Sequence, residues 1–229
     1  MMNEVVIVDS VRTGLAKSFR GSFNLTRSDD MVAFLIDSLL ARNPNVDPQE
    51  IQDVTLGITN QTGEQGSNLA RLSVVLSKLP LAVAGTTVNR FCASGSQAIA
   101  NAANQIASGY ADIAIAGGVE SISMTQRQDA GSYTRNPILL AEKPDIFMQM
   151  GDTAEVVAKR YGVTREAQDE YALQSQQRYA AAVNAGYFDD EIIPMPATMK
   201  KVDRATGEET LVDVIVDKDE CNRPETTLD

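Results

Sequence analysis

The sequence predicts an α/β protein: a mostly parallel mixed sheet with a buried central helix, followed by a mainly helical subdomain that carries a hairpin. In the first half, short apolar segments alternate three times with longer segments of helical periodicity. This alternation is typical of right-handed crossovers between parallel strands. After Met124 the composition shifts to loop-rich residues and long Ala- and Gln-rich helical segments. We therefore expect an α/β core over residues 1–120 and a subdomain over residues 121–229.

The expected strands of the core are short runs rich in Val, Ile and Ala. They comprise residues 4–10, 54–59, 86–89 and 112–118, with a further strand expected over 119–124. Residues 5–8 form an uninterrupted apolar run, which is typical of a strand buried on both faces.

Three helices are expected between these strands. They comprise residues 28–43, 69–79 and 92–108. In the third, apolar residues recur at helical spacing from Ile99 to Ile106, and Gly109 stands where a left-handed C-cap belongs. Its many small residues predict close packing, so Cys92 is expected to open a buried central helix.

The second half predicts two helices and a hairpin. One helix follows Gly151 and ends at Gly162, and Thr164 caps a longer helix that Gly186 closes. Hairpin strands are expected over residues 200–202 and 210–216, joined by a turn.

Composition excludes several function classes. The net charge is −11 with no basic run, which argues against nucleic acid or an anionic membrane as the main partner. The chain has no His and two Cys, which excludes a disulfide framework and a Cys/His zinc site. No apolar run approaches the ~18 residues of a membrane span, and Glu4 and Asp9 replace the basic region of a secretory signal. We expect a cytoplasmic protein with no metal site.

Cys92 is the candidate nucleophile. A thiol at the start of a helix faces unpaired backbone N–H groups and the positive end of the helix dipole, and both stabilise the reactive thiolate. The alternative is a buried structural Cys, which is the commoner role of an isolated Cys. Because the chain lacks His, the base that would serve Cys92 is either unusual or not on this chain.

Residues 88–106 resemble the acyl-enzyme cysteine signature of the thiolases. Further matches fall in chain order at residues 12–13, 117–124, 150–155, 186–194 and 219–224. The resemblance extends over nearly the whole chain, and it favours Cys92 as a nucleophile over a structural Cys.

The resemblance implies acyl transfer between coenzyme A thioesters. Cys92 would attack the 3-keto carbon of a 3-ketoacyl-CoA, release acetyl-CoA and pass the acyl group to free coenzyme A; the reverse reaction is a Claisen condensation. The backbone N–H of Cys92 is a candidate oxyanion donor. Coenzyme A and acyl-CoA are then substrates, with no permanently bound cofactor. The expected partners are further copies, in a homodimer or homotetramer, and a fatty-acid oxidation subunit.

The resemblance also implies two coenzyme A contacts. Arg223 would lie near the nucleotide end of coenzyme A, or else be a solvated surface residue. Met150 would lie near the pantetheine and acyl channel, or else pack in a core. Gln149 replaces a His that short-chain biosynthetic thiolases often carry, which favours the degradative, broader-chain type. Cys221 is interpreted as structural.

Thiolases continue into a second α/β half that supplies an Asn-Glu-Ala-Phe, a Gly-His-Pro and a Cys-x-Gly motif, and none of these occurs here. Two hypotheses follow. The sequence belongs to a working thiolase whose remaining half is not shown, or it is a catalytically incomplete, coenzyme A-binding fragment that is inactive alone. A β-ketoacyl synthase is a third alternative, although its usual cysteine signature differs from residues 89–95.

Overall fold

The computed structural model describes residues 3–126 and 135–228. The chain forms two compact units. The core unit comprises Met1–Gly131 and Asp189–Cys221, and the helical unit comprises Ser132–Phe188 and Asn222–Asp229. This division differs from the expected boundary after residue 120: the first unit extends to Gly131, and the segment that contains the hairpin belongs to it as well.

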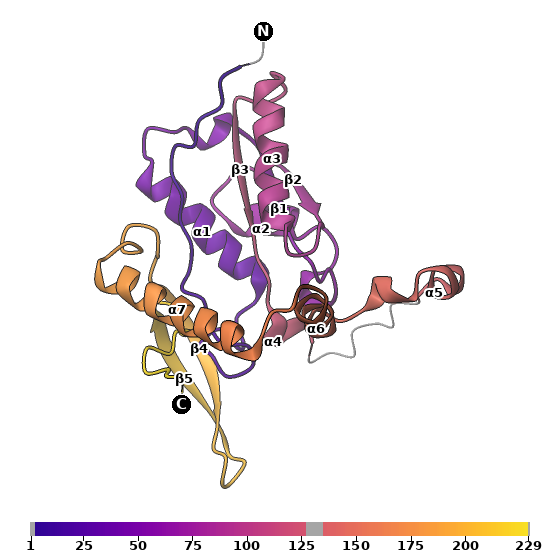
Figure 1. The fold of residues 1–229 in the computed structure, drawn as a ribbon. Helices are drawn as coiled ribbons and strands as arrows, with labels where there is room; N and C mark the ends of the chain where they lie inside the picture. The colour runs from indigo at the N-terminus through magenta and orange to yellow at the C-terminus, as the bar shows by residue number, and fades with distance from the viewer. Residues whose placement is uncertain (1–2, 127–134, 229) are drawn as a thin grey trace. The chain divides into compact units, whose positions relative to one another are not determined.

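The sheet of the core unit has three parallel strands in the order β2-β1-β3 (Figure 1). The strands are β1 (Ile51–Gly57), β2 (Ala84–Val88) and β3 (Ile113–Gly118). In the register of the sheet, Leu56 of β1 lies between Thr87 and Gly117 of its neighbours. The parallel α/β arrangement predicted from the alternation is therefore confirmed.

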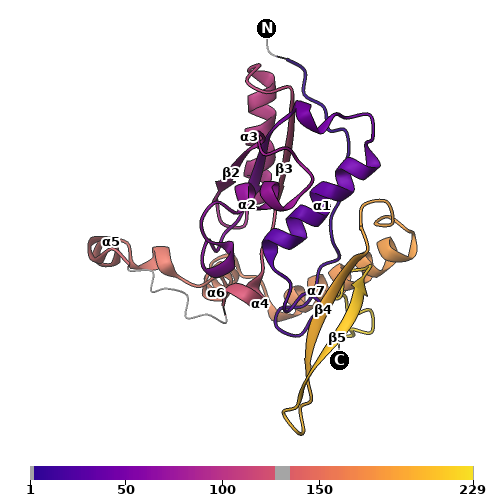
Figure 2. The same ribbon diagram turned by 180° about the vertical axis from the view of Figure 1, so that it is seen from behind.

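The longer helices of the core unit are α1 (Ser28–Arg42), α2 (Leu69–Leu76) and α3 (Ser94–Ala107), with 3₁₀ turns η1 (Pro48–Glu50) and η2 (Gly63–Gln65). Both ribbon views show β3 between α1 and α3 (Figures 1 and 2). Strand residues alternate in direction, so Val54 and Leu56 join α1 and α2 in one apolar cluster. Asp53 and Gly57 point to the other face, where α3 lies: Gln105 of α3 donates to Asp53, and the start of α3 contacts Gly57.

Helix α3 is buried on one side only. Ala98 and Ala102 are buried on its sheet side, whereas Ile99 is 50% exposed. The described residues therefore do not bury this helix on all sides as expected, and Ile99 remains half exposed to solvent.

The residues expected to form the first strand do not pair within the described part of the chain. Val6, Ile7 and Val8 are 68%, 80% and 75% exposed, so the prediction of a buried strand is wrong here. An apolar extended segment is buried only when a neighbouring strand and an apolar layer cover it. Neither is present among the described residues.

The further strand expected over residues 119–124 is also wrong. Ser121 instead caps a short helix, α4 (Ile122–Thr125), by accepting a hydrogen bond from the backbone of Met124. The first N–H groups of a helix have no partner within the helix, and a Ser at the N-cap accepts a hydrogen bond from one of them.

The hairpin consists of antiparallel strands β4 (Met195–Val202) and β5 (Glu209–Val216), as expected, although β4 begins earlier. Met195 and Val216 are buried against Phe23. The side chain of Asn24 donates to the carbonyl of Lys200 at 2.7 Å and accepts from its N–H at 2.9 Å. These contacts explain why the hairpin belongs to the core unit.

The helical unit contains α5 (Pro137–Glu142), η3 (Pro144–Phe147), α6 (Met150–Tyr161) and α7 (Arg165–Asn184). Gly162 and Gly186 have φ of 65° and 74°, and Thr164 accepts from the backbone of Ala167, so the predicted caps are confirmed. In residues 3–126 and 135–228, no helix has the length and apolar character to cross a bilayer.

The close approach of α3 to the sheet can be tested at Gly57. A methyl group there would overlap the backbone of Ser94, so Gly57→Ala should lower the free energy of unfolding by about 1–3 kcal/mol. Gly95→Ala is the matched control: its Cβ would meet nothing within 4 Å, and helix propensity favours Ala by up to ~1 kcal/mol. Urea unfolding followed by circular dichroism compares the two, and equal loss of stability in both would contradict the close approach.

Candidate functional site

Cys92 lies in the turn between β2 and α3, at the carboxyl end of the parallel strands. Helix α3 begins at Ser94 with Ala93 as its N-cap, so Cys92 precedes the helix rather than opening it. Its thiol is free and its side chain exposed. The carboxyl ends of parallel strands are where open α/β sheets bind ligands. The fold therefore presents Cys92 at an accessible edge.

The turn that carries Cys92 is tightly bonded. Phe91 has φ of 48°, a left-handed conformation that is uncommon for a bulky residue and costs of order 1–3 kcal/mol. Its N–H donates to the side chain of Asn89 at 2.9 Å. Ser94, which is 4% exposed, accepts from the N–H of Arg90 at 2.8 Å and donates to the carbonyl of Phe91 at 2.6 Å. These bonds hold the strained residue next to Cys92.

A set of polar side chains is connected to this turn through Thr59, and no role was predicted for it from the sequence. Glu120 follows β3 and accepts from the backbone N–H of Thr59 at 2.8 Å and of Asn60 at 3.3 Å. Gln65 is fully buried and donates to Glu120 at 2.7 Å. Glu120 lies in residues 117–124, one of the segments that resemble thiolases. Its hydrogen-bond partners lie in loops that are distant from it in the sequence.

Glu64 lies beside this set. It accepts hydrogen bonds from the N–H and hydroxyl of Ser28 through one oxygen, and its other oxygen lies 3.8 Å from a guanidinium nitrogen of Arg27. Burial raises the pKa of Glu64 above its ordinary value of 4.5, with the Ser28 bonds and Arg27 acting in the opposite direction.

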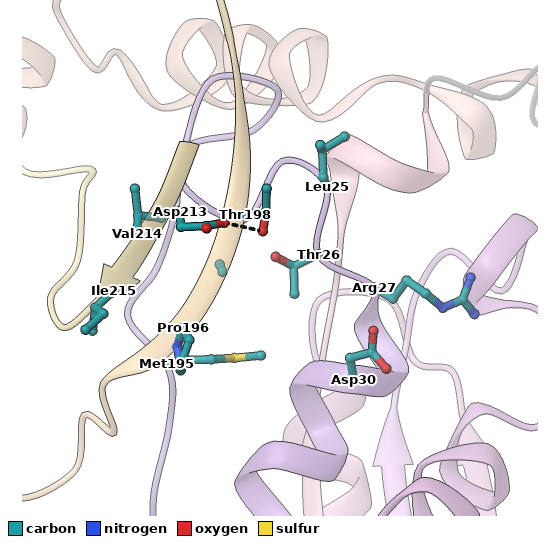
Figure 3. A pocket seen from close by; sticks show the side chains of 11 residues that line it. Leu25, Thr26, Arg27, Asp30, Met195, Pro196, Thr198, Asp213, Val214 and Ile215 are labelled. Atoms are coloured by element: carbon teal, nitrogen blue, oxygen red, sulfur yellow. Dashed lines mark hydrogen bonds between the residues drawn. The ribbon is translucent and has the colours of Figure 1, made fainter. Parts of the chain in front are cut away.

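Two cavities open on the core unit. One, of about 670 Å³, is lined by residues 11–18, by α1, by β3 and by residues 119–123. The other, of about 620 Å³, lies between residues 25–30 and the hairpin; Figure 3 shows its walls, with Thr198 bonded to Asp213 at 2.8 Å. Cys92 lines neither of these cavities.

The two residues expected to contact coenzyme A belong to the helical unit, whereas Cys92 belongs to the core unit. Met150 is the first residue of α6 and is 70% exposed, which removes the alternative of core packing within its unit. Arg223 is exposed, and its N–H donates to the side chain of Gln176 at 2.7 Å. The roles expected for Met150, Arg223 and Cys92 stay predictions.

Cys221, expected to be structural, is an exposed free thiol, so burial does not explain it. Within the described ranges, no group of three His, Cys, Asp or Glu side chains is placed to hold a metal ion.

The raised pKa of Glu64 predicts a pH-dependent stability. The folded state binds the Glu64 proton more tightly than the unfolded chain does. Glu64 therefore adds to the free energy of unfolding at pH values below its ordinary pKa, and this stabilisation is lost as the pH rises through the pKa of the folded state. Glu64→Gln removes the titration. Its stability relative to the parent chain should therefore rise between about pH 4 and about pH 7. Urea unfolding at both pH values measures the difference, and a difference that is the same at both would contradict the prediction.

The two exposed thiols predict different reactivities. Iodoacetamide should alkylate Cys92 faster than Cys221, because Cys92 lies directly before the N-terminus of an α-helix, where unpaired backbone N–H groups favour a nearby negative charge. Peptide mass mapping over time gives both rates in one sample. Cys92→Ser and Cys221→Ser variants serve as controls for the peptide assignment. Equal or reversed rates would count against an activated Cys92.

Comparison with known proteins identifies the family. The family model for the thiolase N-terminal domain matches residues 5–229. A 3-ketoacyl-CoA thiolase of Aliivibrio fischeri is 42% identical over 231 residues, covering all of this chain and 56% of that protein. A 3-ketoacyl-CoA thiolase of Bacillus subtilis is also 42% identical over 231 residues, with 58% of its length covered.

Among solved structures, the Bacillus anthracis acetyl-CoA acetyltransferase is similar with a TM-score of 0.78 and 32% identity. The match covers 99% of this chain and 57% of that one. The chain thus spans little more than half the length of the curated relatives it matches. With a family match over almost its full length and an α/β fold shared with that acetyl-CoA acetyltransferase, the chain belongs to the thiolase family.

Proposed function

We propose that this chain supplies the nucleophile of a thiolase, which transfers acyl groups to coenzyme A by cleaving 3-ketoacyl-CoA. The observation that carries the proposal is the exposed Cys92, which lies in a hydrogen-bonded turn at the carboxyl ends of parallel strands within residues 88–106. Family membership and the names of the relatives support it.

In this mechanism the thiolate of Cys92 forms a bond to the 3-keto carbon of the substrate. The bond between carbons 2 and 3 then breaks, its electron pair passes to carbon 2, and protonation of that carbon releases acetyl-CoA. Free coenzyme A, having lost its thiol proton, attacks the acyl-Cys92 thioester, and Cys92 leaves as thiolate. A thioester of Cys92 is close in free energy to a thioester of coenzyme A, so the acyl-enzyme intermediate is not too stable to react further in either direction.

Each tetrahedral intermediate carries a negative oxygen that needs hydrogen-bond donors. The backbone N–H of Cys92 is the donor proposed on this chain. Coenzyme A is proposed to bind through Arg223, near its nucleotide end, and along Met150, and both side chains are exposed as such contacts require. In a chain of net charge −11, an anionic ligand depends on such local groups.

The second candidate function is a catalytically incomplete, coenzyme A-binding fragment. It is favoured by the absence of His, the commonest general base, and by the open apolar surfaces at residues 5–8 and Ile99. The acid and base would then have to come from another part of the complete enzyme. A β-ketoacyl synthase is disfavoured, because the two relatives described above are named 3-ketoacyl-CoA thiolases.

The finer assignments belong to the same proposal. Gln149 and the relatives named 3-ketoacyl-CoA thiolase favour the degradative, broader-chain type. The complete enzyme is proposed to be cytoplasmic, to form a homodimer or homotetramer, and to work with a fatty-acid oxidation subunit. Coenzyme A and acyl-CoA are substrates in this proposal, and no cofactor is held permanently.

Thiolysis assays on two forms of the protein test the proposal. The 229-residue chain alone should show no loss of the acetoacetyl-CoA enolate absorbance in the presence of coenzyme A, because no His is available as base. The native polypeptide that carries this chain, isolated with its intact mass measured, should be active, and Cys92→Ala should abolish that activity.

Three outcomes would overturn parts of the proposal. Turnover by the 229-residue chain would show that it is catalytically complete. An inactive native polypeptide no longer than this chain would favour the fragment. Acyl-carrier-protein dependence of the activity would favour a synthase.

A further inference from the structure

A continuous path of hydrogen bonds connects the end of β3 to the turn that carries Cys92. It passes from Glu120 through the peptide groups of Thr59 and on to Asn89, which then bonds to the turn itself. All of these residues belong to the core unit. The path joins the carboxyl ends of the three parallel strands.

Glu120 forms the first part of this path. Its carboxylate receives three N–H donors: the backbone of Thr59 at 2.8 Å, the backbone of Asn60 at 3.3 Å, and the amide of Gln65 at 2.7 Å. Gln65 is fully buried and also donates to the carbonyl of Asn60 at 2.8 Å. An ionised carboxylate only accepts, and hydrogen bonds to it are stronger than neutral ones. Glu120 therefore orients the loop that follows β1.

Asn89 forms the second part. Its amide nitrogen donates to the carbonyl of Thr59 at 2.9 Å, and its amide oxygen accepts from the N–H of Phe91 at 2.9 Å. Thr59 thus bonds to Glu120 through its N–H and to Asn89 through its carbonyl. Because Phe91 is the left-handed residue directly before Cys92, the orientation of Asn89 bears on the direction in which the thiol is presented.

We propose that Glu120 and Asn89 are positioning residues for the Cys92 nucleophile. They keep Phe91 in its left-handed conformation, so that Cys92 stays in front of the N-terminus of α3. This inference rests on the proposed function, since it takes Cys92 as the nucleophile. Both residues act in this proposal through hydrogen bonds to backbone and amide groups, and neither is assigned a proton transfer.

The test measures the ratio of alkylation rates of Cys92 and Cys221 by iodoacetamide in the 229-residue chain at neutral pH, with each variant checked for folding by circular dichroism. Glu120→Ala removes three hydrogen bonds of the path and Asn89→Ala removes two, and each should lower this ratio about three- to tenfold. Cys221 reports on general reagent access in the same sample.

Conservative variants separate positioning from general stability. Glu120→Gln keeps one acceptor oxygen, and Asn89→Asp keeps the acceptor for Phe91 but loses the donor to Thr59, so both should restore part of the ratio. Asp47→Ala removes the cap of η1 elsewhere in the core unit and should destabilise the chain without changing the ratio. This control shows whether lower stability alone alters Cys92.

The outcomes are distinguishable. If Cys92 in the parent chain reacts no faster than Cys221, the proposed nucleophile fails. If Cys92 does react faster and the folded Glu120 and Asn89 variants keep the parent ratio, only the positioning inference is overturned. A fall in the ratio for Asp47→Ala equal to that for Asn89→Ala would also overturn it. If Glu120→Ala does not fold, the two Asn89 variants and Glu120→Gln decide the question.

Discussion

The arrangement of the core unit depends on the close approach of α3 to β1. Gly57 has no side chain, so the backbone of Ser94 and Gly95 can lie directly on the end of the strand. A helix held this near to the sheet leaves only a short turn between β2 and α3. That turn requires a left-handed Phe91, and its bonds to Ser94 and Asn89 stabilise a conformation that would otherwise be costly. The accessible position of Cys92 is a consequence of this packing.

Burial is uneven around the sheet. Val54, Leu69 and Val74 are fully buried in the cluster formed with α1 and α2. Ile99 on the outer side of α3 and the valines and isoleucine of residues 5–8 are exposed to solvent. Exposed contiguous apolar surface is uncommon in a monomer and usually marks an interaction surface. This unevenness agrees with a chain that spans little more than half the length of its curated relatives.

The acidic composition has a structural use. Asp219 accepts two hydrogen bonds from the guanidinium of Arg12, and these bonds raise the pKa of Arg12 further above its usual range. Asp219 also accepts a hydrogen bond from the backbone N–H of Leu15. Glu220 accepts from the backbone of Lys17 and from Ser22. Together with Glu120, these carboxylates satisfy backbone N–H groups of loops around the sheet. Part of the negative charge therefore stabilises loops that lack regular secondary structure.

Features that depend only on neighbouring residues could be predicted from the amino-acid sequence. These are the parallel α/β pattern, the helices with caps at Thr164, Gly162 and Gly186, and the cysteine signature. Tertiary structure decided the features that depend on distant partners. Residues 5–8 have the pattern of a buried strand, but no strand pairs with them in the part of the chain that the structure describes. Ser121 caps a helix where a strand was expected, and the hairpin joins the core unit. The hydrogen-bond path from Glu120 to the turn of Cys92 also depends on tertiary contacts, since its bonds join loops about 30 to 60 residues apart along the chain. Local periodicity carries no information on such contacts, because the hydrogen-bond partners meet only when the strands are aligned.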